Sequence, residues 1–237
     1  FFFHADDGIR DFCLSRGLGD VYKRQIISYA TGSIPTSIIT GKYVRGIDIR
    51  EHGSGNAGGT NVYRVLGWKP AIFVILVDIF KGWFPAAVLA RIFFEIQPVP
   101  DFGVVQILCG FSAVLGHTYT IFAGFKGGKG VGTLGGMMIA LFPSVFPFCL
   151  CIAIITIIFT GYVSLASIFA SCSLPVLLIL LPPFLDSSPA PLSIMIFSLL
   201  IPWFIIFTHR SNIQRLRDGS ENQFKKAMIF NKYLLYN

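Results

Sequence analysis

Long apolar runs constrain this chain more than any other feature, because an α-helix that crosses a bilayer needs roughly 20 apolar residues. Seven runs follow one another, separated by short polar segments. They cover residues 26–44, 70–92, 103–122, 131–143, 144–161, 163–185 and 190–208. Only 13% of the residues are charged, whereas soluble domains carry about 25%. The sequence therefore predicts an all-α integral membrane protein with seven transmembrane helices.

The boundary between the fourth and fifth runs depends on two prolines. Pro143 and Pro147 both fall inside residues 131–161. Proline in a helix interior removes a backbone hydrogen bond and clashes with the preceding turn. We therefore expect two short helices in this region in preference to one kinked helix.

Basic residues are distributed unevenly among the connections. Lysine and arginine concentrate in residues 45–69 and 123–130 and in the tail that begins at His209, whereas the charged residues of 93–102 and 186–189 are all acidic. Cytoplasmic loops of membrane proteins are enriched in lysine and arginine. We therefore expect the basic connections and the C-terminus in the cytoplasm and the N-terminus outside. With six spans, the basic loop 123–130 and the basic tail would lie on opposite sides of the membrane. Seven spans therefore fit the distribution of basic residues better.

The first 25 residues do not resemble the rest of the chain. Residues 1–25 are charged and unpatterned, and they lack the basic, apolar and small-residue regions of a signal peptide. We interpret them as a non-native N-terminal extension outside the fold. The seven-span domain is then expected over residues 26–226, followed by a cytoplasmic tail over residues 227–237.

Charge and cysteine usage argue against several classes of protein. The net charge of +7 is spread over loops beside apolar runs, which indicates membrane topology and anionic ligands, with no nucleic-acid partner. The cysteines show neither metal-ligand nor disulfide-framework spacing, so we expect no disulfide, no metal site and no cofactor. They are Cys13, Cys109, Cys149, Cys151 and Cys172.

The first basic loop, residues 46–67, combines glycines with neutral donors and an arginine. Glycine allows successive backbone N–H groups to surround an anion, and Arg64 can bind a phosphate through two hydrogen bonds. The alternative is a flexible glycine-rich loop without a ligand. The candidate binding residues in this loop besides Arg64 are Ser54, Gly55, Asn56, Thr60 and Asn61.

The second loop places two lysines on a glycine-rich backbone just before the fourth apolar run. Its spacing does not match the Walker A motif, which needs four residues between the first glycine and the Gly-Lys pair. Free N–H groups at a helix start favour bound anions. The lysines could instead anchor the membrane interface. The candidate residues are Lys126, Gly127, Gly128, Lys129 and Gly130.

The third segment directly follows the last run. His209 and Asn212 are three residues apart, so a continuing helix places them on one face. Ser164, at the start of the sixth run, could reach a ligand or serve helix packing. Asp78 and Lys81, also three apart, are interpreted as a mutually neutralising pair that supports the structure.

Five stretches in this order resemble the bacterial acyl-phosphate:glycerol-3-phosphate acyltransferases, the PlsY family. The resemblance extends from about residue 26 to residue 226. The stretches are Tyr29–Thr36, Gly46–Gly67, Val77–Gly82, Gly116–Thr133 and His209–Glu221. Glycine stands at positions 59 and 132, where the family usually has alanine, and threonine stands at position 120, where it usually has proline.

The resemblance implies an enzyme of the bacterial inner membrane, with its active site facing the cytoplasm. It would transfer a fatty acyl group from acyl-phosphate to the 1-position of glycerol 3-phosphate, for phospholipid biosynthesis. Ser54, Asn56, Thr60, Asn61 and Arg64 would bind phosphate. The Phe125–Thr133 stretch would bind the acyl-phosphate headgroup, with Lys126 and Lys129 neutralising charge.

Within the third segment, the resemblance implies that His209 and Asn212 orient glycerol phosphate and that Glu221 supports them. Either His209 or a substrate phosphate could take the proton of the attacking hydroxyl. We place Arg64, Lys129, His209 and Asn212 in catalysis. A carrier or channel for phosphorylated metabolites, or a lipid-binding protein without activity, is the competing class. Neither kind of protein explains why the expected anion-binding loops all lie on one side of the membrane and why the sequence has no internal repeat.

Overall fold

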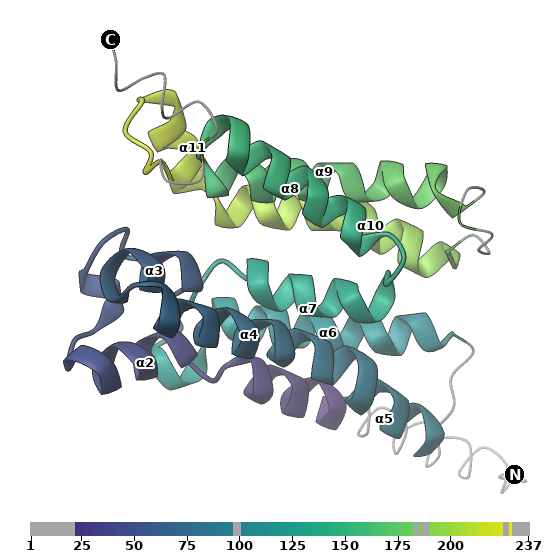
Figure 1. Cartoon of the computed structure of the whole chain (residues 1–237). Helices are drawn as coiled ribbons and strands as arrows, with labels where there is room; N and C mark the ends of the chain where they lie inside the picture. The colour runs from purple at the N-terminus through teal and green to yellow at the C-terminus, as the bar shows by residue number, and fades with distance from the viewer. Residues whose placement is uncertain (1–21, 97–100, 183–184, 186–189, 225–227, 229–237) are drawn as a thin grey trace, which may run out of the picture.

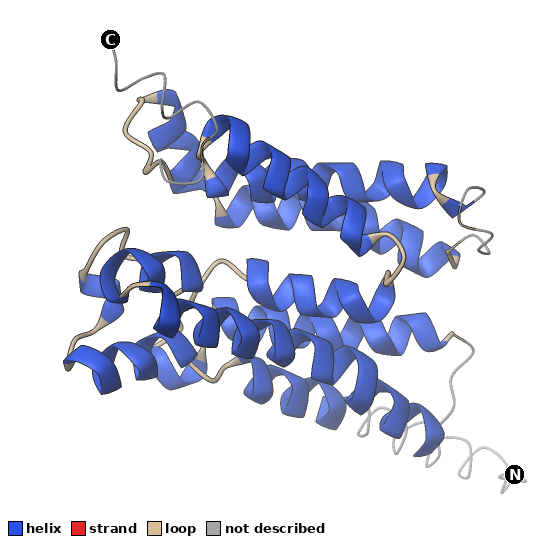
Figure 2. Ribbon diagram, in the orientation of Figure 1, coloured by secondary structure: helices blue, strands red, loops and turns tan. Residues whose placement is uncertain are grey.

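The computed structural model describes residues 22–96, 101–182, 185, 190–224 and 228, and these residues form helices joined by loops, without a strand (Figure 1, Figure 2). Trp68–Glu95, Phe102–Ala123 and Val163–Leu180 are each long and apolar enough to cross a membrane. Leu192–Thr208 is also long and apolar enough when it is counted together with Arg210–Arg217, which follows it after a bend of 62°. The all-α class is confirmed. The number of spans and their direction across the membrane stay predictions.

The first apolar run is not one helix. Residues 22–32 form a helix that already includes the last four residues of the segment we had placed outside the fold. The helix ends before Pro35, and α2 (Thr36–Arg45) follows as a separate element. Proline at position 35 cannot continue the hydrogen-bond ladder, which is why residues 26–44 do not form the single expected span. Residues 1–21 lie outside the described part of the chain.

The helices lie in two layers (Figure 1). One layer contains the helix of residues 22–32 together with α4, α5, α6 and α7, and the other contains α8, α9 and α10. A π-helical turn, η2, joins α4 to α5. The bounds are α4 (Trp68–Phe84), η2 (Pro85–Leu89), α5 (Ala90–Ile96), α6 (Phe102–Thr118), α7 (Val131–Leu141), α8 (Phe146–Thr160), α9 (Val163–Leu180) and α10 (Leu192–Thr208).

The expected break near Pro143 is confirmed, because α7 ends at Leu141 and α8 begins at Phe146. Pro147 occupies the first turn of α8. A missing N–H is harmless there, because the first turn has no intrahelical partner for it. The short α7 and α8 can thus run in opposite directions and belong to different layers.

Glycine allows α4 and α7 to approach each other closely. A Cβ atom at Gly82 would lie 1.7 Å from the carbonyl oxygen of Thr133, and one at Gly136 would lie 1.8 Å from that of Ile79. Only hydrogen fits at these two positions. The contact fixes the start of α7 beside the middle of α4, and therefore beside Asp78.

The main apolar core joins the two layers, and the outer surface of the bundle is apolar as well. Buried side chains of α6, α7, α9 and α10 form one cluster that includes Val114, Met137, Leu174 and Ile201. On the outside, large apolar side chains such as Trp203 remain exposed, with 74% of its surface accessible. Exposed apolar area on this scale is typical of a surface that contacts lipid.

The short polar elements gather at one end of the bundle, on the left in Figure 1. The C-terminal ends of α6 and α10 and the N-terminal ends of α4, α7 and α9 meet there. The three loops predicted to carry the chemistry therefore lie at the same end. The short elements at this end are α2, η1 (Ile49–Glu51), α3 (Gly59–Leu66), η3 (Ile121–Ala123) and α11 (Arg210–Arg217).

Candidate active site

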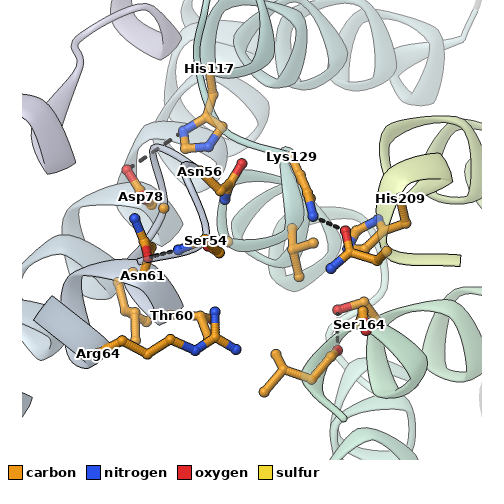
Figure 3. Close-up of a pocket in the computed structure, with 18 of the residues that line it drawn as sticks. Ser54, Asn56, Thr60, Asn61, Arg64, Asp78, His117, Lys129, Ser164 and His209 are labelled. Carbon is orange, nitrogen blue, oxygen red and sulfur yellow. Dashed lines mark hydrogen bonds and ion pairs between the residues drawn. The ribbon is translucent and has the colours of Figure 1, made fainter. Parts of the chain in front are cut away.

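A cavity of about 250 Å³ opens between the two layers at the polar end of the bundle (Figure 3). It combines the first loop and α3 with the start of α7 on one side, and the start of α9 with α11 on the other. Ten of the predicted site residues line it: Ser54, Asn56, Thr60, Asn61, Arg64, Lys129, Ser164, His209, Asn212 and Glu221. Its other lining residues are Gly58, Gly59, Ile75, Asp78, His117, Val131, Gly132, Val163 and Ser167.

Asn61 organises the first loop from within. Its amide nitrogen donates to the carbonyl oxygens of Ile49 and His52, both at 2.9 Å, and its Oδ1 accepts from the backbone N–H of Ser54 at 2.8 Å. Both N–H groups of the amide are thus used by the protein. The predicted role of Asn61 as a phosphate donor is not compatible with this geometry. Asn61 instead holds Ser54 at the cavity.

Arg64 and Lys129 bring positive charge into the cavity from opposite loops. Burial lowers the pKa of the Arg64 guanidinium, although nearby Glu221 acts in the other direction. In the described part of the chain, neither cation forms an ion pair with a carboxylate. Lys129 Nζ donates to Oδ1 of Asn212, which also lines the cavity. Two cations that form no ion pair among the described residues favour an anionic ligand.

Burial, followed by the charge of Arg215, lowers the pKa of Lys129 to about 8. Lys129 is therefore cationic below this pH and progressively neutral above it. We expect the apparent second-order rate constant of the free protein for its anionic substrate to fall as pH rises through about 8. The variant Lys129→Arg keeps its charge, and its pH–rate profile should lack this alkaline decline. If the variant shows the same alkaline decline, a group other than Lys129 causes it.

Glu221 holds the third segment together. Its Oε1 accepts from Asn212 at 2.6 Å and from Ser164 at 2.9 Å, and its Oε2 accepts from Arg215 at 2.8 Å. Burial alone would raise the pKa of this carboxyl, but the hydrogen bonds from Asn212, Arg215 and Ser164 hold it below its usual range. Glu221 therefore stays ionised and orients Asn212 toward Lys129.

His209 caps α10 and is buried, with 3% of its surface exposed. Burial, and then the charge of Lys129, lower the pKa of its imidazole to about 4. Its Nδ1 lies 2.8 Å from the carbonyl oxygen of Ile205. A carbonyl only accepts, so Nδ1 carries the proton and Nε2 is left as a hydrogen-bond acceptor. His209 is thus a neutral acceptor at physiological pH.

The second loop differs from the expectation in detail. The backbone N–H of Gly127 donates to the carbonyl oxygen of Thr118, and that of Gly128 donates to the carbonyl oxygen of His117, both at 3.1 Å. These two N–H groups are therefore not available to an anion. After this loop, the start of α7 at Val131 and Gly132 lines the cavity.

Four further predicted residues lie outside the lining of the cavity together with Gly127. Gly55 and Lys126 are exposed, and the Lys126 carbonyl accepts from Arg50 at 3.3 Å. Gly130 begins α7 with a φ of 80°, a conformation that favours glycine. Gly128 packs against the ring of His117. The structure thus gives Gly128 and Gly130 shaping roles in this loop.

Sequence reasoning missed two chemically important lining residues, Asp78 and His117. Asp78 was interpreted only as the partner of Lys81, and His117 was given no role beyond its place in the Gly116–Thr133 stretch. Their signal was the cost of placing ionisable groups in apolar runs. The sequence could not show that α4 and α6 place both side chains at the same cavity.

The fold and the cavity define a class of protein: a helical integral membrane protein with a cavity at one end of its bundle that is lined by basic side chains. The sequence profile of the family "Glycerol-3-phosphate acyltransferase" matches residues 24–219. The glycerol-3-phosphate acyltransferase of Chlorobium phaeovibrioides is 44% identical over 220 residues, covering 83% of this chain and 93% of that protein. That of Pelodictyon phaeoclathratiforme is 43% identical, with the same coverage.

Two crystal structures of PlsY, described as an integral membrane glycerol 3-phosphate acyltransferase, are similar to this structure. One is a glycerol 3-phosphate form and the other a lysophosphatidic acid form. Each has a TM-score of 0.71 and 36% identity and covers 86% of this chain, with 95% and 94% of the respective crystal chain covered. The chain belongs to the glycerol-3-phosphate acyltransferase family, of the PlsY type.

Proposed function

We propose that this protein transfers a fatty acyl group from acyl-phosphate to the 1-hydroxyl of glycerol 3-phosphate, from the cytoplasmic face of a bacterial inner membrane. The observation that carries the proposal is the cavity between the layers, where Arg64 and Lys129 face the ligand space and, among the described residues, neither forms an ion pair with a carboxylate. Both substrates and both products carry phosphate, so these cations have a ligand at every stage of the reaction.

The reaction needs positioning and charge stabilisation more than a protein nucleophile. The 1-hydroxyl oxygen attacks the acyl carbonyl carbon, and the tetrahedral intermediate collapses with release of inorganic phosphate. Acyl-phosphate is a mixed anhydride whose leaving group is already good. Lys129 and Arg64 can stabilise the charge that develops on the leaving phosphate, and the start of α7 adds free N–H groups.

The proton of the attacking hydroxyl has two possible acceptors in this cavity. His209 presents a neutral Nε2, but an imidazole whose pKa is about 4 is a weak base. A phosphate dianion, whose second pKa is about 6, is the stronger base. We therefore assign the proton to a substrate phosphate, while His209 accepts a hydrogen bond from the hydroxyl and orients it.

The variant His209→Gln separates these two roles. Glutamine can still accept a hydrogen bond but cannot take a proton, so we expect partial activity. The acidic limb of the pH–rate profile should remain near 6 in both proteins, because it reports the substrate phosphate. A different outcome would make His209 the base: wild type shows an acidic limb near 4, and the folded variant is inactive.

The donor is tested directly with purified full-length protein in phospholipid vesicles. Acyl-phosphate and acyl-CoA are compared with labelled glycerol 3-phosphate as the acceptor. We expect lysophosphatidic acid and inorganic phosphate in equal amounts from acyl-phosphate, and no product from acyl-CoA. Product formation from acyl-CoA alone would contradict the proposed donor, while the family assignment would stand.

A further inference from the structure

Three buried ionisable residues form a cluster beside the cavity that the proposed mechanism does not use. Asp78 and Lys81 lie on α4 and His117 lies at the end of α6. Lys81 Nζ is 2.7 Å from Asp78 Oδ1, and each of the three residues has less than 9% of its surface exposed. Asp78 and His117 also line the cavity. Ionisable groups held this deep in an apolar bundle favour a functional role.

Three groups surround the Lys81 ammonium. It is ion-paired with Asp78, whose Oδ1 lies 2.7 Å from Nζ, it donates to the carbonyl oxygen of Ile34 at 2.8 Å, and it lies 3.4 Å from Nδ1 of His117. The Ile34 carbonyl is available because the first helix has ended before Pro35. An ammonium can only donate, so Nδ1 of His117 must accept and its proton must reside on Nε2.

Asp78 does not accept a hydrogen bond from Nδ1 of His117, so it leaves the proton on Nε2. Its Oδ1 lies 3.6 Å from Nδ1 of His117, beyond hydrogen-bond distance, while it is ion-paired with Lys81. His117 is therefore a neutral imidazole whose Nε2–H is a hydrogen-bond donor.

The donor side of the ring faces the loop that carries Lys129. A Cβ atom at Gly128 would lie 2.2 Å from Nε2 of His117, so the ring keeps its position only because residue 128 is glycine. Figure 3 shows the imidazole on the side of the cavity where Asn56 lies. In the described part of the chain, no protein group accepts a hydrogen bond from Nε2. A donor in a cation-lined cavity without a protein acceptor fits a ligand that supplies one.

We propose that His117 is a substrate-binding residue whose Nε2–H donates to a phosphate oxygen, and that Asp78 and Lys81 are positioning residues that fix its tautomer. The inference deepens the proposed function, because it adds a neutral donor to the cations at Arg64 and Lys129. The ion pair of Asp78 and Lys81 has no net charge. It can therefore hold the imidazole without adding charge to the cavity.

Two substitutions at position 117 separate ligand binding from structural support. The amide nitrogen of His117→Gln can reach the position of Nε2, whereas the shorter amide of His117→Asn reaches only that of Nδ1. Inorganic phosphate and glycerol 3-phosphate are titrated into each purified full-length variant, and binding is followed by the rise in melting temperature. We expect His117→Asn to bind both at least about tenfold more weakly, and His117→Gln to bind within about threefold of wild type.

Two results would overturn the role of His117. One is unchanged phosphate binding by His117→Asn, and the other is equal loss in both variants at an unchanged ligand-free melting temperature. This readout does not depend on the acyl donor. If wild type fails to use acyl-phosphate while the two variants still differ in phosphate binding, the proposed donor is wrong and the His117 assignment stands.

The double variant Asp78→Asn with Lys81→Met tests the positioning pair without leaving a lone buried charge. We expect weaker phosphate binding, because Nδ1 of His117 loses its donor and the tautomer is no longer fixed. Adding His117→Asn to this background should then cause less loss than it does alone, since the residues act as one unit. Fully additive losses would show that the pair stabilises the fold and does not position His117.

Discussion

Replacement of Arg64 or Lys129 by alanine is expected to lower kcat/KM for acyl transfer on the order of a hundredfold or more, comparable to removing one donor that stabilises a developing oxyanion. Both side chains line the cavity, and neither is neutralised by an acidic partner among the described residues. Each substitution thus removes a charge that the protein cannot replace locally. The rate of lysophosphatidic acid formation measures the effect.

Two further variants make this result specific. Arg64→Lys should restore little activity, because one ammonium does not reproduce the planar, two-point hydrogen bonding of a guanidinium. Lys69→Ala removes an exposed cation at the same end of the bundle, where its ammonium lies over the ring of Trp68, and it should leave the rate unchanged. Similar losses in Lys69→Ala would indicate a general charge effect and contradict a local role for Arg64 and Lys129.

Replacement of Glu221 by alanine should give the largest loss of stability. The carboxylate accepts from Ser164, Asn212 and Arg215, and its removal leaves these donors without their partner at a largely buried site. Leaving a buried hydrogen-bonding group without its partner costs about 1–3 kcal/mol. We expect a lower melting temperature and, in the protein that remains folded, slow transfer because Asn212 is no longer oriented toward Lys129.

The control for this prediction lies at the end of α11, four residues before Glu221. Arg217 is exposed, so Arg217→Ala should retain the melting temperature of wild type. Glu221→Gln keeps one oxygen for Ser164 and Asn212 but turns an amide toward Arg215, and it should be intermediate. A melting temperature of Glu221→Ala equal to that of Arg217→Ala would show that the carboxylate does not hold the third segment.

Some features of the site were readable from local sequence. The loop around Ser54, the Lys129 loop and the His209–Glu221 segment were each recognised from residue type and spacing, and the structure brings them to one cavity. The separation of α7 from α8 followed from Pro143 and Pro147. These predictions succeeded because apolar length, proline and glycine act on the backbone within a few residues.

Other features depend on contacts between distant segments. The two N–H groups of Asn61 and those of Gly127 and Gly128 looked available to a phosphate. The fold supplies protein acceptors for all of them. The segment around Pro35 looked like part of a span, yet its break frees the Ile34 carbonyl for Lys81, which lies 47 residues further on. Spacing alone cannot say which protein group will accept from a given donor.

The sequence by itself determined that this protein is a helical membrane protein, and it indicated three polar segments as candidates for binding an anion. Hydropathy, charge and backbone preference are properties of short stretches of chain, so they can be predicted without knowledge of the fold. Only the tertiary structure decided which donors remain free for a ligand, that Glu221 orients Asn212, and that Asp78 and His117 reach the cavity. Those outcomes depend on the packing of α4 against α6 and α7 and on the meeting of the two layers, because a hydrogen bond forms only where its partners arrive within about 3 Å.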